Sequence, residues 1–400
     1  MKITRIEATE VTVPIEAPLR FAYGVHLAFT RTIIQVHTDL GIVGLGETAA
    51  TADQVQRLGE PLIGIHPFDL EVVRNTISNR FYWSRDPLVA AGLEMALIDI
   101  IGKAMDEPAY RVLGGAVRDH IEMAAYCFYR YPNKTGQQLA VSTPEEMAAH
   151  ARDLVGRYGF GTVKLKGGVL SADVEVSTME ALRAELGPNV RLRLDPQSAW
   201  TVETAILYAP RLEAVGLEYY EDPVAGAPSM ATVRRSTRLA MSTNMCVTSF
   251  AELGPAIAIG AIDVVLTDPW YWGGPTQVRA LDTVARTMGI GLSMHSGIEL
   301  GIGMAVMAHT GVTMPGLTAA VDAHYHHLTD DVIAGDMLLP HNGVLHPPAG
   351  AGWGVTLDMD KVGQYQEVHA SGVYRNVYVE ANSAGPDPER PSWRPIIPAW

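Results

Sequence analysis

The sequence predicts an α/β protein: a modified (β/α)8-type barrel with an altered last helix, joined to an α+β capping domain formed by the N-terminal segment and the C-terminal tail. From Glu122 onward, short apolar strands alternate with amphipathic helices, about eight strands with about seven helices over roughly 200 residues. Polar or ionisable residues end nearly every one of these strands, and active sites of barrels are built at that end. This second observation favours the barrel over an open, doubly wound sheet.

The first unit is expected to be a small sheet with a helix packed on it. Alternating β-branched residues predict strands at RIEATEVTV, TIIQVHTD and IVGLGE, with a short turn at Leu40 and Gly41. From Pro87 to Asp106, apolar residues recur at steps of three and four, which is typical of a helix. Two adjacent glycines after that helix mark the joint to the barrel. The predicted domains are residues 1–117 for the cap, 118–325 for the barrel and 326–400 for a segment that returns to the cap.

The segment after Asp322 shows neither a helical nor a strand period. It ends in GPDPERPSWRPIIPAW, which holds five prolines in 16 residues. Such a composition disfavours regular structure. We therefore expect this segment to wrap back over the first unit without a helix or strand of its own.

Composition excludes several classes of function. Acidic residues number 44 and basic ones 30, giving a net charge of −14, so a nucleic acid would be repelled. The two cysteines, Cys127 and Cys246, lie in apolar runs and suit free thiols in a reducing compartment. The start of the chain carries acidic residues where a signal peptide needs an apolar core, and no apolar run approaches the length of a membrane span. We expect a cytoplasmic homo-oligomer that binds a small molecule and no membrane.

Three oxygen-bearing side chains end successive strands of the predicted barrel: Asp195, Glu221 and Asn244. Carboxylate and amide oxygens are the ligands that hard divalent cations such as Mg²⁺ prefer. Any one of these residues alone would more often cap a neighbouring loop. Three at consecutive strand ends predict a Mg²⁺ site that leaves positions for a substrate carboxylate.

Lys164 and Lys166 are spaced i, i+2, so both side chains point to the same side of one strand, into the mouth. Two ammonium groups held together beside a cation favour the neutral form of at least one of them. An isolated K-x-K pair is usually solvated, but the strand-end position favours a lysine that accepts a proton.

His295 ends the seventh strand and Asp268 the sixth, so the two side chains can be neighbours. A carboxylate bonded to one imidazole nitrogen raises the basicity of the other, which is the arrangement of a general base. From the residues alone, the ring of strand ends therefore predicts metal-assisted proton abstraction beside a carboxylate.

Two other patterns in the sequence could indicate a different kind of site. Gly44, Gly46 and Ala49 fit the G-x-G-x-x-A pattern of dinucleotide binding, but they lie in a hairpin strand rather than between a strand and a helix. His324, His326 and His327 could form a soft-metal cluster, although no cysteine or acid spacing supports zinc. We expect the latter two histidines to be structural.

The motifs KLKGG, LDP with Trp200, YYEDP, STNM, LTDPWYW, MHS and AVDAHYH, together with FTR and GLGE in the cap, cover nearly the whole chain. In this order they resemble the enolase superfamily, and specifically its glucarate dehydratase subgroup among the mandelate racemase and muconate lactonizing enzyme-like proteins. The resemblance implies that Lys166 is one base and that His295 with Asp268 is the base on the opposite face. It also implies that Lys164 neutralises the substrate carboxylate.

The resemblance further implies a set of substrate-binding residues in the mouth: His26, Arg31, Tyr126, Phe128, Gln197, Ser296, Asp322 and His324. Other positions depart from the subgroup's pattern: Phe21 replaces an asparagine, Ala91 a threonine, Gln197 an asparagine, and Gly297 with Ile298 replaces two asparagines. Most of these changes remove polar groups, so we expect D-glucarate to be a poor substrate and a related acid sugar, shorter or less hydroxylated at its far end, to be preferred.

The predicted activity is that of a lyase, an acid-sugar dehydratase that uses Mg²⁺ and forms an ene-diolate before β-elimination of water gives a 2-keto-3-deoxy acid. One alternative is a racemase or epimerase of a 2-hydroxy acid on the same machinery. Another is a carboxylate-binding relative without catalysis, although the intact bases and ligands argue against it.

Overall fold

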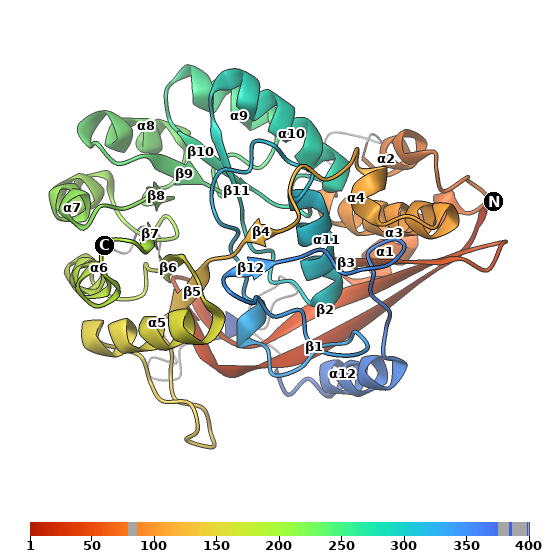
Figure 1. The fold of residues 1–400 in the computed structure, drawn as a ribbon, viewed down its shortest axis with the longest axis horizontal. Helices are drawn as coiled ribbons and strands as arrows, with labels where there is room; N and C mark the ends of the chain where they lie inside the picture. Colours follow the sequence, from red (N-terminus) through yellow and green to blue (C-terminus); the bar gives the residue numbers. More distant parts are fainter. Residues whose placement is uncertain (79–85, 375–383, 386–397, 399) are drawn as a thin grey trace.

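The computed structural model describes residues 1–78, 86–374, 384–385, 398 and 400, and shows an antiparallel cap beside a parallel barrel (Figure 1). In the four-stranded cap sheet, β2 (Gly24–Thr38) pairs on one side with β1 (Ile3–Phe21) and on the other with β3 (Val43–Thr48) and the short β13 (Ala384–Gly385). Helical segments pack beside it: α1 (Ala52–Gly59), η1 (Glu60–Leu62), α2 (Leu70–Ser78), α3 (Pro87–Met105) and α4 (Ala109–Val112).

The barrel is built from seven parallel strands that pair in sequence order. They are β5 (Ala125–Phe128), β6 (Thr162–Lys166), β7 (Arg191–Asp195), β8 (Tyr219–Glu221), β9 (Met241–Thr243), β10 (Val264–Thr267) and β11 (Gly291–Met294). One helix follows each strand: α5 (Pro144–Tyr158), α6 (Ala172–Leu186), α7 (Val202–Val215), α8 (Ala227–Ser236), α9 (Phe250–Ala258), α10 (Pro275–Met288) and α11 (Gly301–Gly311). The predicted fold class is confirmed.

The eighth predicted strand, residues 317–322, is not a regular strand. Its backbone nonetheless bonds to both edges of the sheet: Thr318 N donates to Leu292 O in β11 (3.0 Å), and Val321 N donates to Glu122 O (2.7 Å). Pairing is limited to single bridges, Leu292 with Leu317 and Met123 with Val321, which is too little for a continuous ladder. A short 3-10 turn, η2 (Tyr325–His327), follows in place of an eighth helix.

The first two strands of the cap are much longer than the sequence predicted, and their hairpin tip reaches the barrel. Arg20 N donates to Tyr129 O just after β5 (2.9 Å), and Ala22 N donates to the Oε1 of Gln197 after β7 (2.9 Å). The prediction missed this extension because Pro18 and Gly24 read as strand breakers. The tip therefore lies against the ends of the barrel strands.

Helix α3 is buried over nearly its whole length, from Val89 to Gly102. Strand β3 packs against it so closely that a Cβ at Gly46 would lie 2.0 Å from Gly92 O, and one at Gly44 would lie 1.9 Å from Ala96 O. Both glycines therefore allow a strand and a helix to approach. They do not open a phosphate-binding loop, as expected from their position in a hairpin strand.

The C-terminal segment contains more regular structure than expected. Strand β12 (Val344–Leu345) pairs with β4 (Ile121–Glu122), and helix α12 (Met359–Ser371) lies along β1 (Figure 1). The prediction of no helix there was wrong; Asp358 caps α12 by accepting hydrogen bonds from Asp360 N and Lys361 N, so capping and packing override a weak period.

Much of the proline-rich tail lies outside the described residues. Strand β13 (Ala384–Gly385) pairs with β2 at His26 and Val25. Trp400 N donates to Ala199 O (3.1 Å), beside the end of β7. Among the described residues, no helix combines the length and apolar character needed to cross a membrane.

The close packing of β3 on α3 predicts that Gly46→Ala destabilises the protein. The added methyl would have to displace helix backbone, which costs about 1–3 kcal/mol in an overpacked core. A lowered midpoint in urea denaturation would show this loss. The matched control is Gly156→Ala in α5, where an added Cβ meets nothing within 4 Å and stability should rise by about 0.5–1 kcal/mol. Equal midpoints for the two variants would contradict the assignment.

Candidate active site

The parallel register aligns the inward-pointing residues of neighbouring strands in layers. Phe128, Lys166 and Asp195 form one row across β5, β6 and β7. Tyr126, Lys164 and Arg193 form the row beneath it. Residues two apart on a strand share a face, so the sequence spacing of the two lysines produces this stacking.

The two lysines are buried in ion pairs with three carboxylates. Lys166 Nζ lies 2.6 Å from Asp195 Oδ2, and Lys164 Nζ lies 2.5 Å from Glu221 Oε1 and 2.8 Å from Asp322 Oδ2. Burial alone would lower the pKa of Lys164, but the Asp322, Glu221 and Asp195 carboxylates raise it above its usual value. The expected neutral lysine is therefore not Lys164, whose ammonium is held in its charged form. This charge suits a group that faces a substrate carboxylate.

Asp322 lies in an ion pair network below the mouth. Its second oxygen, Oδ1, is 3.1 Å from Arg193 Nη1, and Arg193 also donates to Glu218 and to the backbone of Ala320. Both carboxylate oxygens of Asp322 are in ion pairs, one with Lys164 and the other with Arg193. Asp322 therefore holds the Lys164 ammonium in place. Arg193 was missed, although the alternation in RLRLD places it two residues before Asp195 on the same face.

The three predicted metal ligands converge at the ends of β7, β8 and β9. The side-chain amide of Asn244 lies between Glu221 and His295, with one end 3.2 Å from Glu221 Oε1 and the other end 3.1 Å from His295 Nε2. Lys164 Nζ, 2.5 Å from Glu221, is also 3.6 Å from Asp195 Oδ2, so one ammonium touches both carboxylates. Asp195, Glu221 and Asn244 therefore line one small polar space.

This space fits a divalent cation. Glu221 Oε2 is buried and has no hydrogen-bond partner among the described residues. Burial and the nearby Asp195 carboxylate raise the pKa of Glu221 well above its usual value, so a further positive charge beside Oε2 would stabilise the ionised carboxylate. Carboxylate and amide oxygens are the ligands that Mg²⁺ prefers.

Asp222, the residue after Glu221, supports the predicted metal ligand Asn244. Its carboxylate accepts hydrogen bonds from Thr243 Oγ1 (2.5 Å) and Asn244 N (2.8 Å). Burial raises the pKa of Asp222 to about 7. Sequence reasoning passed over it, although the EDP motif places it beside a predicted ligand.

His295 lies on the opposite side of the ligand group from Lys166. Its Nδ1 is 3.6 Å from Asp268 Oδ2, which is an ion-pair distance but too long for a hydrogen bond. Burial lowers the pKa of His295, Asp268 opposes this effect, and the two lysines reinforce it. Asp268 Oδ1 accepts from Trp270 N (2.8 Å) and Tyr271 N (2.7 Å), which fixes the carboxylate that faces His295.

The cap contributes two of the predicted substrate-binding residues. His26 Nδ1 and Arg31 Nε are buried without a hydrogen-bond partner among the described residues. Burial, Arg31 and Lys166 lower the pKa of His26 to about 3. Gln197 serves a different purpose from the one predicted, because its side-chain oxygen accepts from Ala22 N and so joins the cap tip to the barrel.

Glu47 in β3 connects the cap to helix α11. Its carboxylate accepts from Leu300 N (2.7 Å) and Gly303 N (2.9 Å), and its Oε1 lies 4.0 Å from Arg31 Nε. Burial raises the pKa of Glu47 to about 7. The residue belongs to the GLGE motif, but the sequence alone did not indicate its contact with α11.

An aromatic wall surrounds His324 at the closing segment of the barrel. The His324 ring lies 4.7 Å from the Tyr126 ring and 5.2 Å from the Phe128 ring, and Phe21 from the cap tip stacks on it at 5.9 Å. Ser296 Oγ is 2.5 Å from His324 Nδ1. Phe21 therefore fills, with an apolar ring, the place where the family pattern has a polar residue.

Two of the departures from that pattern lie in packed surroundings. A Cβ at Gly297 would lie 2.5 Å from Trp270 Cε3, so an asparagine there requires Trp270 to move. Ala91 is fully buried in α3. Both altered residues are thus part of the core packing.

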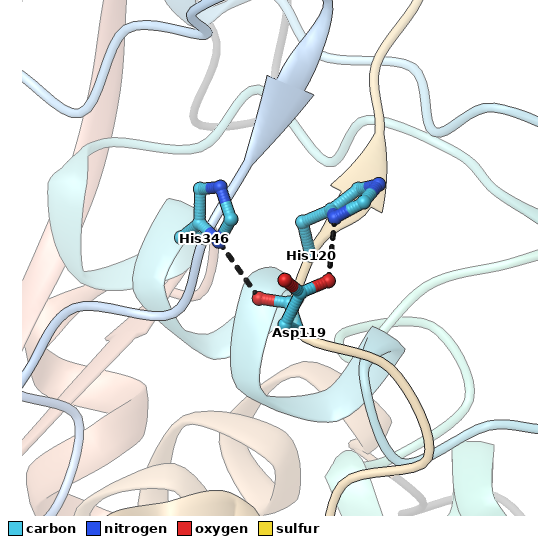
Figure 2. A group of neighbouring side chains, drawn as sticks. All are labelled: Asp119, His120 and His346. Atoms are coloured by element: carbon cyan, nitrogen blue, oxygen red, sulfur yellow. Dashed lines mark hydrogen bonds and ion pairs between the residues drawn. The ribbon is translucent and has the colours of Figure 1, made fainter.

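Other histidines lie away from the mouth. His327 Nε2 bonds to Tyr126 O (2.9 Å), and His326 is buried against it, which supports a structural reading for both. A separate group, Asp119, His120 and His346, has its potential ligand atoms within 4.8 Å of one another (Figure 2). It adjoins the β4–β12 pair, before the first barrel strand and thus at the end opposite the mouth, and its contacts are internal: His120 Nδ1 with Asp119 Oδ1 (2.7 Å) and His346 Nδ1 with Asp119 O (2.9 Å).

The buried ion cluster predicts that Lys164→Met is strongly destabilising when divalent cations are absent. Glu221 and Asp322 would lose their shared ammonium, and an unpaired buried charge costs about 3–5 kcal/mol. The control is Lys361→Met, which breaks a partly exposed pair with Asp330 worth about 0–1 kcal/mol. Urea denaturation in a chelating buffer measures both. A loss for Lys164→Met no larger than that of the control would refute the role given to this ammonium.

Comparisons with known proteins identify the family of this chain. Residues 3–114 match the mandelate racemase / muconate lactonizing enzyme N-terminal domain, and residues 146–361 match the enolase C-terminal domain-like family. A Streptomyces coelicolor protein named "Probable glucarate dehydratase" is 36% identical over 435 residues, covering 100% of this chain and 99% of the relative.

Two solved structures are similar over the whole chain. An enolase from Mycobacterium smegmatis, complexed with tartrate, is 36% identical with a TM-score of 0.91 and covers 100% of this chain and 98% of that one. An enolase from Pseudomonas fluorescens with bound magnesium, potassium and tartrate is 30% identical, with a TM-score of 0.88 over 100% and 99% of the two chains. These matches confirm the resemblance stated from the motifs: the chain belongs to the enolase superfamily.

Proposed function

We propose that this protein is a Mg²⁺-dependent acid-sugar dehydratase, a hydro-lyase that converts a hydroxylated acid into a 2-keto-3-deoxy acid. The observation that carries the proposal is the placement of two bases on opposite sides of one polar space. Lys166 Nζ lies 2.6 Å from Asp195, while His295 Nε2 lies 3.1 Å from the side-chain amide of Asn244. A substrate carbon held between them can lose its proton to either side. The 36% identical relative supports dehydration as the outcome.

Asp195, Glu221 and Asn244 would hold Mg²⁺, and bound Mg²⁺ supplies positive charge beside the substrate carboxylate. The unpartnered Glu221 Oε2 supports this assignment. So does the magnesium bound in the Pseudomonas fluorescens relative.

The chain's own residues account for the remaining chemistry. The Lys164 ammonium faces the substrate carboxylate, and either Lys166 or His295 removes the neighbouring proton according to the configuration of that carbon. An ene-diolate forms, the β-hydroxyl leaves as water, and tautomerisation gives the keto acid. Neither base is strong enough alone, so the fixed cations around the carboxylate must supply much of the acceleration.

The cap and the aromatic wall define which acid is bound. His26 and Arg31 offer unpartnered polar atoms, while Phe21 and Phe128 make the adjoining surface apolar. A long acid rich in hydroxyls would leave polar groups unpaired against these rings, at about 1–3 kcal/mol each. The preferred substrate is therefore shorter than glucarate or less hydroxylated at its far end. The four-carbon diacid tartrate, bound by the Mycobacterium smegmatis relative, has such a size.

The proposal is tested by incubating the enzyme with four- to six-carbon acid sugars and Mg²⁺ in heavy water, with detection by NMR. We expect a 2-keto-3-deoxy product, and a kcat/KM for D-glucarate below that for a shorter acid. Deuterium incorporation with inversion and no keto acid would instead identify a racemase or epimerase. Neither product nor deuterium incorporation with any acid in the panel would identify a carboxylate-binding relative. If glucarate is the best substrate, the specificity argument is contradicted.

In the same assay Lys166→Ala and His295→Asn should each abolish dehydration of one substrate epimer, since positioned bases contribute about 10²–10⁴-fold. The remaining base can still exchange the proton on its own face. His346→Asn, at the opposite end of the barrel, is the matched control and should keep its rate. If either base variant stays within a few fold of wild type on every substrate, that residue is not a base.

Loss of a metal ligand should weaken Mg²⁺ binding as well as activity. Loss of a residue that hydrogen-bonds to a metal ligand lowers metal affinity about 10- to 100-fold. For Asp195→Asn, Glu221→Gln and Asn244→Leu we expect the affinity for Mg²⁺ to fall by more than this. Calorimetric titration with MgCl₂ measures it, with Asp330→Asn on the surface as control. Full turnover in the presence of a chelator would rule out the metal assignment.

A further inference from the structure

Glu299, Ser296 and His324 form a continuous hydrogen-bonded chain beside the mouth. Ser296 Oγ lies 2.6 Å from Glu299 Oε2 and 2.5 Å from His324 Nδ1, and all three side chains are buried. We propose that this chain is a proton relay that delivers a proton from His324 Nε2 to the departing hydroxyl of the substrate. The inference rests on the proposed dehydratase function and adds the acid that such a reaction needs.

The geometry of the relay is fixed by backbone hydrogen bonds. His324 N donates to Glu299 Oε1 (2.9 Å) and to Ser296 Oγ (3.1 Å), so the segment after residue 322 is tied to the loop after β11. Glu299 itself immediately precedes Leu300, whose amide is held by Glu47 of the cap. Each member of the chain therefore has one defined position.

The open end of the relay lies beside the bases. His324 Nε2 is buried and has no hydrogen-bond partner among the described residues. The His324 ring lies 4.7 Å from the Tyr126 ring, and the same Tyr126 ring lies 5.4 Å from Lys166 Nζ. A substrate whose proton is taken by Lys166 thus has His324 as a close neighbour for its next carbon.

Each proton that the relay gives to the substrate is replaced from the next group along the chain. With Glu299 protonated, its O–H donates to Ser296 Oγ, the Ser296 O–H donates to His324 Nδ1, and Nε2 carries the proton that faces the substrate. When the carbon–oxygen bond breaks, Nε2–H protonates the leaving hydroxyl to form water. His324 Nδ1 then takes the Ser296 proton and Ser296 takes the Glu299 proton, which leaves a carboxylate. The relay is recharged when the proton returns from solvent.

The charges around the chain explain why His324 would need a partner. Burial, Lys166 and the neighbouring His327, His295 and His26 lower the pKa of His324 well below its usual value, so the imidazolium is disfavoured. Burial raises the pKa of Glu299, against opposing contributions from Ser296, Arg31 and backbone amides. Both shifts favour the neutral forms of Glu299 and His324, as the relay requires if the carboxyl supplies the proton and the histidine only changes tautomer.

The activity test compares elimination with exchange of the α-proton in heavy water for Glu299→Gln, which keeps the shape and the acceptor for His324 N but cannot release a proton. We expect elimination to fall about 10²–10⁴-fold, while α-proton exchange stays within threefold of wild type. Glu185→Gln, which breaks a surface pair with Arg152, is the matched control and should change neither rate. Equal loss of exchange and elimination in Glu299→Gln would overturn the relay.

A second measurement does not depend on turnover. In protein labelled with ¹⁵N-histidine and assigned with His324→Asn, the His324 ring should change from the Nε2–H to the Nδ1–H tautomer as rising pH ionises Glu299. In Glu299→Gln this change should be absent, and Ser296→Ala should uncouple the ring from Glu299. If the pH-dependent change of the His324 tautomer is the same in Glu299→Gln as in wild type, the relay is overturned. If the change occurs but wild type yields no keto acid from any substrate, the dehydratase proposal fails and the delivery of a proton to a leaving group fails with it.

Discussion

The structure depends on the balance of charge that the barrel encloses. Three carboxylates, Asp195, Glu221 and Asp322, are held at the strand ends by Lys164, Lys166 and Arg193, and these groups are almost completely removed from water. Unpaired charges would not be tolerated at this depth. The parallel register provides the pairing, because it stacks inward residues of adjacent strands in rows. The same arrangement that makes the interior stable leaves Glu221 Oε2 without a hydrogen-bond partner among the described residues, and this atom is available to a cation.

The cap completes a mouth that the barrel strands alone would leave open. The β1–β2 hairpin carries Phe21, His26 and Arg31 to the barrel, where Gln197 accepts the amide of Ala22. The proposed bases and metal ligands come from the strand ends, while Phe21, His26 and Arg31 come from this hairpin. The departures from the family pattern lie both in the cap, at Phe21 and Ala91, and after barrel strands, at Gln197, Gly297 and Ile298, so substrate preference can change while the proposed proton-abstracting groups are kept.

The barrel and the convergence of the lysine pair with Asp195, Glu221 and Asn244 were predictable because strand-end position and a two-residue spacing are visible in the sequence. The extent of β1 and β2 was not, since Pro18 and Gly24 mask a hairpin that tertiary contacts with the barrel stabilise. Helix α12 was missed for a similar reason. Glu299 and Glu47 could not be identified from the sequence, because each of these buried carboxylates accepts hydrogen bonds from backbone amides of distant segments, and no local pattern reveals such contacts. Gln197 was assigned to the substrate, yet its oxygen holds the cap.

The contact of Glu47 with the start of α11 links two motions that would otherwise be independent. If the cap moved away from the barrel, the amides of Leu300 and Gly303 would lose their acceptor, and the loop that carries Ser296 and Glu299 would lose its anchor. The position of the cap and the alignment of the proposed proton-carrying side chains are thus coupled. In the proposed dehydratase, this coupling would align the acid only while the cap is seated on the barrel, and the ene-diolate would be protected from premature protonation.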